Sequence, residues 1–426
     1  MNKVDISVIV PIHNTPQEPL RQCLESLISQ KEVSYEIILV DDYSTKHETI
    51  EIINKYKSKY EKLITYIRMQ ENCGAAEARN IGFSNAKGAY CIFLDSDDFF
   101  SDSLLNKLYT ACIHKDLDIC ICGFSLYYHN PPQIESCNLP FTYEDIKDKD
   151  DMLLNIPASG SNRLCRVDYL KKHNIFFQSL PSDNDLLYSL MTVLCTKKIG
   201  IINDSNLIFY RYNTDYQISA RMNPLNMLDA IKKTYEEANE KSVYTNKNNM
   251  IVEYAINTGL MEMERCNNEL VCSKFYELFR NFLEIVPHNI NNSKMKIYEE
   301  KWLLYGYKSL WFKRIGDYYS QLKNSDQLIK VLKSNDLDLF MWGRGKRGLA
   351  FEKVCAEKRV NIDGVCDEKN NDIGKKDEQG NIIVSTSFVR KRRCLLVATN
   401  HSIYNSIFKQ IDDEIRIVDL EMYCPL

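Results

Sequence analysis

The sequence lacks a long hydrophobic run, and this absence excludes several classes of protein. No uninterrupted apolar stretch reaches the roughly 18 residues that a helix needs to span a bilayer. Residues 1–5 carry charge and lead into a short apolar strand pattern that is too brief for the core of a secretory signal peptide. We therefore expect a cytoplasmic protein, either in solution or attached peripherally to the inner face of the membrane.

The chain also has little net charge and no paired cysteine motif. Its formal net charge is -4, so no global field attracts nucleic acid, and we expect no nucleic-acid partner. Its 15 cysteines are odd in number and include no CxxC spacing, which favours reduced, buried thiols. Cys120 and Cys122 stand two apart in an apolar run, as neighbours on one face of a strand do.

What is present is an alternation of strand and helix patterns in an N-terminal α/β domain. A length of 426 residues allows two or three domains at roughly 150 residues each. The order of patterns predicts a mostly parallel sheet. We expect strands at residues 6–10, 36–40, 64–68, 90–94 and 116–128, and helices at 20–29, 49–60 and 75–86.

The sequence pattern changes twice after this domain. Helical spacing dominates residues 223–335, and a second α/β pattern begins at Asp338. This pattern has strands near 339–342, 360–366 and 394–398, and helices to about residue 358 and near 403–411. We therefore divide the chain into residues 1–222, 223–335 and 336–426, with a small Rossmann-like domain last.

Acidic residues follow two of the predicted strands. Asp41 and Asp42 end the second strand, and Asp95 and Asp97 end the fourth. Ligands of open parallel sheets collect at the carboxyl ends of the strands, so both pairs should face one crevice. Alternate carboxylates on an extended segment suit Mg²⁺ or Mn²⁺ bound to a diphosphate. The same residue types are also common in turns and at helix N-caps.

Four ordered segments resemble the family 2 glycosyltransferases of the GT-A fold, and the resemblance covers residues 5–220. The matching segments are SVIVPIHN at 7–14, LVDDYST at 39–45, NCG with ARN within 72–80, and FLDSDD at 93–98. The resemblance implies an inverting transferase that uses a nucleotide-sugar donor.

The resemblance also implies roles for individual residues. Asp42 would read the uracil edge of UDP, and Asp97 of the DxD motif would bind the metal. The remaining donor-site positions are Pro11, His13, Gly74, Arg79, Asp95 and Ser96. His13 stands where a tyrosine is more usual. Two alternatives stay open: Asp42 as an Asx-turn residue and Arg79 as a surface helix arginine.

Residues 181–188 resemble the second acidic motif of the family, which supplies the catalytic base. Asp185 matches the aspartate of that motif, whereas Asn184 stands in place of the usual glutamate. A partly desolvated carboxylate there would have a raised pKa and could accept the proton of the acceptor hydroxyl. Asp183 is the rival, and we expect it to be the N-cap of the following helix.

Two further segments resemble parts of the family that lie near the acceptor or over the diphosphate. Asn162 lies in a segment similar to the family's Asn-Lys-Leu stretch. Arg211 lies in a Tyr-Arg segment, with Ser219 downstream, that closes over the diphosphate in the family. Some members carry a metal-binding histidine in that segment, but this chain has Asn213, so we expect no third protein ligand.

The C-terminal pattern carries a glycine loop of its own. Gly343, Gly345 and Gly348 follow a predicted strand, and Asp367 ends the next strand 19 residues after Gly348. This spacing is typical of nucleotide-binding loops. We favour a Rossmann-shaped scaffold without a bound cofactor.

These observations lead to one leading hypothesis and two alternatives. The leading one is metal-dependent transfer from a UDP-sugar to a hydroxyl of a cell-surface glycan precursor or a lipid-linked oligosaccharide, by a protein that can form homo-oligomers. The alternatives are a nucleotide-binding oxidoreductase and a non-catalytic scaffold of a polysaccharide-assembly complex.

Overall fold

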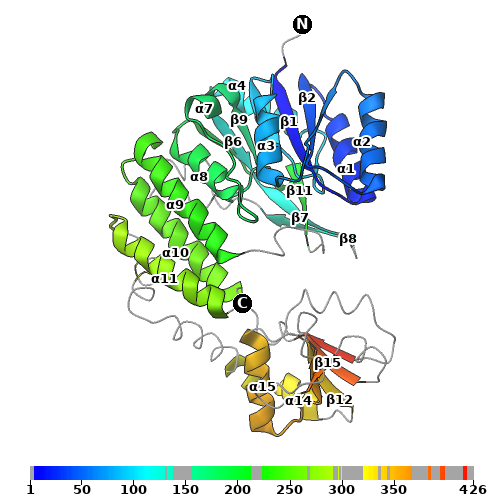
Figure 1. Ribbon diagram of the computed structural model, residues 1–426, viewed down its shortest axis with the longest axis vertical. Helices are drawn as coiled ribbons and strands as arrows, with labels where there is room; N and C mark the ends of the chain where they lie inside the picture. The colour runs from blue at the N-terminus through cyan, green and yellow to red at the C-terminus, as the bar shows by residue number, and fades with distance from the viewer. Residues whose placement is uncertain are drawn as a thin grey trace. The chain divides into compact units, whose positions relative to one another are not determined.

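The computed structural model divides the chain into two compact units (Figure 1). Unit one comprises Met1–Leu260 and Leu278–Glu300, and unit two comprises Met261–Glu277 and Lys301–Leu426. The residues that the structure describes are 4–129, 132–137, 156–212, 223–265, 269–290, 296, 299, 320–333, 337–342, 346–366, 382–384, 394–398 and 416–419.

The first part of the chain alternates strands and helices as predicted. The elements are β1 (Ile6–Ile12), α1 (Gln17–Ile28), β2 (Tyr35–Asp41), α2 (His47–Lys59), β3 (Ile64–Arg68), α3 (Ala75–Ser84), β4 (Tyr90–Phe93), β5 (Phe99–Phe100), α4 (Leu104–His114), β6 (Ile119–Cys122), β7 (Phe124–His129), β8 (Pro132–Cys137), β9 (Arg163–Arg166), α7 (Val167–Lys172), α8 (Leu186–Leu194), β10 (Ile199–Ile202), the 3₁₀ helix η1 (Ser205–Leu207) and β11 (Ile208–Arg211). The single strand expected at 116–128 is wrong: it is two strands, β6 and β7, which belong to different sheets.

A seven-stranded sheet forms the centre of unit one, in the order β10-β6-β9-β4-β1-β2-β3. Its neighbours pair in parallel except at β9, which runs antiparallel to both β4 and β6. β1 lies between β2 and β4, so the chain switches sides of the sheet there. Such a switch point is where open α/β sheets bind their ligands.

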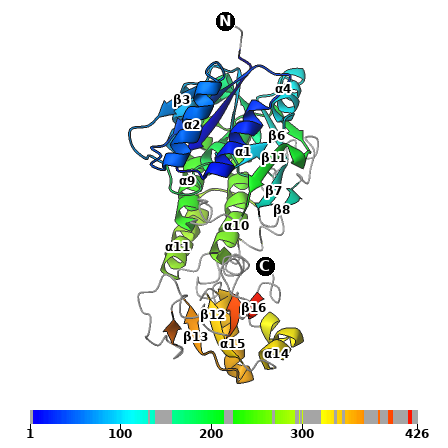
Figure 2. The ribbon, with the colours of Figure 1, turned by 90° about the vertical axis from the view of Figure 1, so that its right-hand side faces the viewer.

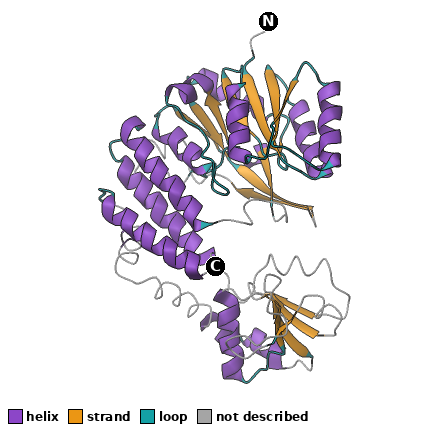
Figure 3. Ribbon diagram, in the orientation of Figure 1, coloured by secondary structure: helices purple, strands orange, loops and turns teal. Residues whose placement is uncertain are grey.

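Helices cover both faces of this sheet (Figures 2 and 3). On one face, Leu20 of α1, Ile53 of α2 and Leu105 of α4 share a core with Val8 and Val10. Burial on two faces explains why β1 and β2 are nearly continuous runs of β-branched and apolar residues.

The opposite face carries α3 and α8. A Cβ on Gly82 of α3 would lie 2.3 Å from a methyl of Ile9, so this helix needs a glycine to approach β1. Tyr188 of α8 meets Phe93 of β4 edge to face, with ring centroids 5.4 Å apart. The sheet is therefore the middle of three layers.

The structure also describes a second, smaller sheet and three long helices after it in the sequence. The sheet has the order β5-β11-β7-β8. The helices are α9 (Pro224–Lys241), α10 (Lys247–Arg265) and α11 (Glu269–Ile285), in agreement with the helical spacing of this part of the sequence. The division of the chain at residues 222 and 335 stays a prediction. Among the described residues, no helix has the length and apolar character needed to cross a membrane.

Unit two contains a parallel sheet in the order β14-β13-β12-β15-β16. Numbered within the unit this is 3-2-1-4-5, an order that occurs in doubly wound α/β sheets, and the Rossmann-like character of this unit stays a prediction. Its elements are α14 (Asp326–Lys333), β12 (Asp338–Trp342), α15 (Lys346–Lys358), β13 (Gly364–Cys366), β14 (Ile383–Val384), β15 (Cys394–Ala398) and β16 (Arg416–Asp419). Gly343, Gly345, Asp367 and the helix expected at 403–411 lie outside the described residues.

Candidate active site

The DxD segment follows β4 directly and alternates in burial. Asp95 and Asp97 are partly exposed, whereas Ser96 and Asp98 are buried. The Ser96 hydroxyl lies 2.6 Å from the Thr15 hydroxyl in the loop after β1. Burial and the neighbouring Asp95 raise the pKa of Asp97 to about 6. Asp95 and Asp97 therefore lie close to each other after the carboxyl end of β4. Their roles at a ribose and a metal ion stay predictions.

Asp98 is a buried carboxylate that the sequence reasoning did not single out. Its Oδ1 accepts the backbone N–H of Arg211 at 2.7 Å, and its Oδ2 has no hydrogen-bond partner in the described structure. Burial, Asp97 and Asp95 raise its pKa well above the ordinary value. Its position after the DxD motif was the one available signal.

Arg211 is buried against the same turn. Its Nε donates to the backbone carbonyl of Asp97 at 2.8 Å, and its Nη2 donates to Gln22. Its guanidinium also lies 5.1 Å from the centre of the Tyr127 ring. These contacts favour a role in holding the DxD turn, and its contact with a diphosphate stays a prediction.

Asp42 follows β2 and is 2% exposed. Its Oδ1 accepts the backbone N–H of Cys73 at 2.7 Å, and its Oδ2 accepts that of Gly74 at 2.8 Å. Each carboxylate oxygen has a second lone pair, so these bonds leave capacity for a ligand N–H. Gly74 has a φ of 91° and open space beside it, and α3 begins at the next residue.

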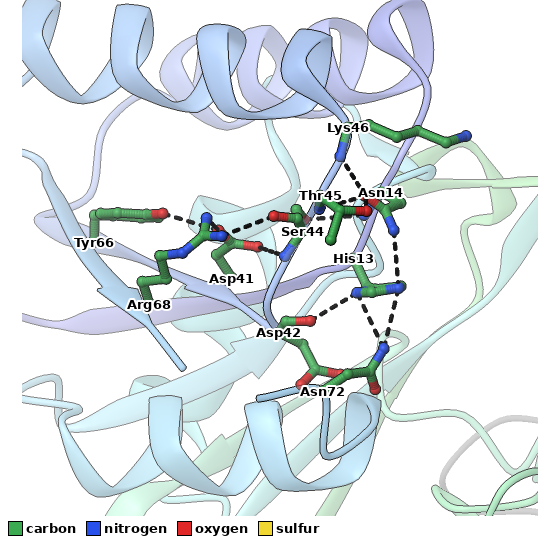
Figure 4. Close-up of polar contacts among 10 residues, drawn as sticks. All are labelled: His13, Asn14, Asp41, Asp42, Ser44, Thr45, Lys46, Tyr66, Arg68 and Asn72. Atoms are coloured by element: carbon green, nitrogen blue, oxygen red, sulfur yellow. Dashed lines mark hydrogen bonds and ion pairs between the residues drawn. The ribbon is translucent and has the colours of Figure 1, made fainter. Parts of the chain in front are cut away.

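Asp41 has a different environment from its neighbour (Figure 4). Its Oδ1 accepts the backbone N–H of Ser44, and its Oδ2 accepts from Tyr66 and from Arg68 at 2.5 Å. Arg68 also donates to the Ser44 carbonyl. Asp41 is thus the completely buried last residue of β2, and its side chain holds the turn that follows.

The loop after β1 meets the loop after β2 through His13 and Asn14 (Figure 4). His13 Nδ1 lies 2.7 Å from the Asp42 carbonyl, so that nitrogen carries the proton, and Nε2 can accept from Asn14 and Asn72. The Asn14 side-chain oxygen accepts the backbone N–H of Thr45 and of Lys46. His13 itself is exposed, next to the carboxylate that the sequence assigns to the nucleotide. Pro11 lies buried within β1, opposite Val40.

Arg79 is buried, and this excludes the reading of a surface helix arginine. Its Nη2 donates to Asp95 at 2.5 Å and its Nη1 donates to Asn184 at 2.9 Å. One side chain therefore connects the DxD motif to the segment that carries Asp185.

Asp185 is the N-cap residue of α8, although its side chain accepts no capping hydrogen bond. The expectation that Asp183 is the N-cap is therefore wrong. Asp183 instead has a positive φ of 56° and accepts a hydrogen bond from the Ser182 hydroxyl. Burial raises the pKa of Asp185 to about 6, while the positive charge of Arg79 opposes the rise. A carboxylate with this pKa is a competent base at neutral pH.

Asn162 and Arg163 lie in a buried network between β9 and α8. Asn162 is 1% exposed and its Nδ2 lies 3.4 Å from the Cys122 carbonyl. Arg163 donates to the Ser189 carbonyl at 2.7 Å and to the Thr192 hydroxyl at 2.9 Å. These contacts fix α8, and the acceptor-side role of Asn162 stays a prediction. Asn213 and Ser219 lie outside the described residues.

The carboxylates of the DxD segment are the groups that could supply donor atoms to a cation. Among the described residues, no group of three or more His, Cys, Asp or Glu side chains is arranged to hold a metal ion. Asp95 and Asp97 fit a half-site for Mg²⁺ or Mn²⁺, since these ions combine carboxylate oxygens with the phosphate oxygens of a substrate.

The N-terminal part of the chain is similar to known glycosyltransferases. The sequence model described as "Glycosyl transferase family 2" matches residues 7–173. The uncharacterized glycosyltransferase EpsJ of Bacillus subtilis is 36% identical in an alignment of 246 residues that covers 54% of this chain and 67% of that protein.

Another relative is the poly(ribitol-phosphate) beta-glucosyltransferase of Bacillus spizizenii, which is 29% identical over 202 residues. That alignment covers 47% of this chain and 31% of the Bacillus spizizenii protein, so the chain spans less than a third of that relative's length. The match to glycosyltransferase GlyG of Streptococcus pneumoniae, at 37% identity, covers 29% of this chain and 40% of that protein.

Solved structures show the same fold at low sequence identity. The crystal structure of residues 1–349 of S. aureus TarS in complex with UDP-GlcNAc aligns with a TM-score of 0.56 and 20% identity, over 67% of this chain and 82% of that one. This likeness establishes the GT-A-like α/β fold of the N-terminal part. Together with the sequence match to EpsJ and the family model, it shows that the chain belongs to glycosyl transferase family 2.

Proposed function

We propose that the chain transfers a sugar from a UDP-sugar to a hydroxyl of a cell-surface polysaccharide precursor, with inversion at the anomeric carbon. The observation that carries the proposal is the link that α3 makes between three distant carboxylate segments. Its N-terminal backbone binds Asp42, and its Arg79 binds both Asp95 and the neighbour of Asp185. A transferase needs a nucleotide site, a diphosphate site and a base in one crevice.

The donor half of the reaction is assigned to the ends of β1, β2 and β4. Asp42 is offered as the acceptor for a pyrimidine N–H, because a base without a donor at that place would leave a buried lone pair of the carboxylate without a partner. Pro11, His13 and Gly74 would border the base, and Asp95 with Ser96 would border the ribose. Asp97 would hold Mn²⁺ or Mg²⁺, and such an ion neutralises charge on the departing diphosphate.

The acceptor half is assigned to Asp185. The acceptor oxygen forms a bond to the anomeric carbon while the bond from that carbon to the phosphate oxygen breaks. Asp185 removes the proton from the attacking hydroxyl, and the electron pair of the broken bond leaves with UDP. The acceptor class is a glycan or a lipid-linked oligosaccharide, met in the cytoplasm or at the inner face of the membrane.

A panel of UDP-sugars tests this function. The bound ligand of one structural neighbour is UDP-GlcNAc and one relative is named a glucosyltransferase, so UDP-GlcNAc and UDP-glucose come first. We expect Mn²⁺-dependent release of UDP from at least one member, and loss of that release in Asp97→Ala. If no UDP-sugar in the panel binds or reacts, the proposed function is wrong.

A further inference from the structure

Two neighbouring side chains of α3 hold the segment that leads to Asp185. The Asn80 side chain pairs with the backbone of Phe177 in both directions. Its Nδ2 donates to the Phe177 carbonyl at 2.9 Å, and its Oδ1 accepts the Phe177 N–H at 3.0 Å. A reciprocal pair of this kind fixes both the position and the orientation of the peptide that it binds.

Arg79 holds the same segment at a second point. It donates to the Asn184 side chain at 2.9 Å, and its guanidinium lies 5.1 Å from the centre of the Phe177 ring. Phe177 is itself 2% exposed and stacks on Tyr188 with centroids 4.2 Å apart. Both ends of the segment 177–184 are therefore hydrogen-bonded to α3, Phe177 through Asn80 and Asn184 through Arg79.

α3 is fixed in turn on the donor side. Asp42 binds the backbone at the start of the helix, and Gly82 packs on Ile9 and Val40 with no room for a larger residue. The helix cannot shift along the sheet without breaking these contacts. It therefore forms a fixed connection between Asp42, which we propose to read the base, and the segment that leads to Asp185.

We infer that Arg79 and Asn80 are positioning residues that set the distance between the donor sugar and the carboxylate of Asp185. The inference rests on the proposed function and assigns this task to α3. In an in-line displacement the base must lie within hydrogen-bond reach of the attacking hydroxyl, and a displacement of about 1 Å can cost roughly a hundredfold in rate. Neither side chain takes up the proton in this scheme.

Asn80 separates positioning from donor binding. Arg79 also binds Asp95, so its replacement would disturb both halves of the site. The hydrogen bonds of the Asn80 amide go to Phe177, in the base segment. Asn80→Ala removes both of those bonds. Asn80→Asp has the same shape but places a carboxylate oxygen against the Phe177 carbonyl, and it serves as a second variant if the alanine variant folds poorly.

The matched control is Asn85→Ala. Asn85 is an exposed asparagine at the end of the same helix, and its side chain donates to the Ile81 carbonyl within α3. Removal of its amide leaves the Phe177 contacts intact. Asn85→Ala therefore shows the effect of losing an asparagine side chain from this helix without losing the contacts to Phe177.

The experiment compares parent, Asn80→Ala, Asn80→Asp and Asn85→Ala by three measurements. These are UDP affinity by calorimetry with Mn²⁺ present, turnover of the best UDP-sugar by UDP release, and backbone hydrogen exchange. For both Asn80 variants we expect UDP affinity within about twofold of the parent and a fall in kcat of roughly tenfold to a hundredfold. Exchange should rise in a peptide covering residues 177–187 and stay unchanged in one covering 36–46. Asn85→Ala should match the parent in all three.

Different outcomes overturn different claims. A parent protein that neither binds UDP nor turns over any UDP-sugar would contradict the proposed function, whatever the exchange result. An active parent whose Asn80 variants keep full kcat would contradict the positioning role. Equal losses of UDP affinity and kcat in both variants would contradict it as well, because they would show that Asn80 supports the donor site.

Discussion

The Asp42 carboxylate accepts the backbone N–H of Gly74 through Oδ2 at a distance of 2.8 Å, at the point where α3 begins. With the bond from Cys73 to Oδ1, this contact gives both carboxylate oxygens a backbone partner. Asp42 therefore has a structural task as well as the nucleotide-reading task that we propose for it. A substitution at this position affects both tasks, so the preference for UDP over other nucleotides, and not affinity alone, reports the reading of the base.

We expect the parent protein to prefer UDP over ADP and GDP, and Asp42→Asn to lose most of that preference. Asparagine keeps one oxygen for a backbone N–H but presents an N–H where a uracil donor would bind, so the expected loss of UDP affinity is roughly tenfold or more. Calorimetry with the three nucleotides measures it. Equal affinity of the parent for all three would rule out a base-reading role.

Metal dependence is expected to reside in the DxD segment. EDTA, or Asp97→Ala, should weaken UDP binding at least about tenfold, because the ion would bridge this carboxylate and the diphosphate. Asp102→Ala is the control, since Asp102 is an exposed carboxylate that pairs with Lys31. UDP affinity that survives both EDTA and Asp97→Ala would show that the segment binds no essential ion.

Asp185→Asn should separate binding from chemistry. The amide keeps the shape of the carboxyl group but cannot accept the proton of the acceptor hydroxyl. We expect UDP affinity within a few-fold of the parent and turnover lower by roughly a hundredfold or more. Near-normal transfer by this variant would move the base role to Asp183 or to another group.

The pH dependence of turnover should report the same carboxyl group. Burial raises the pKa of Asp185 to about 6, and the base must be deprotonated to act. The kcat/KM for the donor, which reports groups of the free protein, should therefore rise with pH through about 6 and level off above it. A rate that stays constant between pH 5 and pH 8 would contradict this assignment.

Asp185 should also lower the stability of the fold at neutral pH. Because its pKa in the folded state lies above the ordinary value of 3.8, folding favours the protonated form. The protonated Asp185 therefore adds to the free energy of unfolding below about pH 4, and this stabilisation is lost as the pH rises through about 6. Asp185→Asn should consequently raise the thermal midpoint at pH 7.5 and change it little at pH 4.

The two units should differ in nucleotide binding. Beyond residue 222, Asn226 binds the Ser182 hydroxyl and Tyr244 binds the Thr196 carbonyl, so α9 and the following turn support the base segment and α8. We expect a chain ending at residue 300 to keep UDP affinity. The segment from 336 to 426 should show no measurable UDP affinity, and micromolar binding of UDP-sugar or NAD(P) by that segment would favour a chain with two activities.

The amino-acid sequence was sufficient to predict the parallel core and the edge of the sheet at which the candidate residues meet. Short β-branched runs such as those of β1 and β2, separated by helical patterns, predict a parallel sheet because both faces must be buried. The carboxyl ends of parallel strands meet at one edge. The acids that follow β2 and β4 were therefore expected to lie near each other. In the structure both contact the region of α3: Asp42 accepts the N–H of Gly74 just before the helix, and Asp95 binds Arg79 within it.

Only the tertiary structure decided which of these groups are connected and how. Arg79 binds Asn184 across 105 residues, and Asp98 binds the backbone of Arg211 across 113 residues. Local patterns around Arg79 are equally compatible with an exposed helix position, and those around Asp183 and Asp185 with either residue as the N-cap. The choice depends on how the segment before α8 packs against α3, and side-chain contacts between such distant segments leave no periodicity in the sequence.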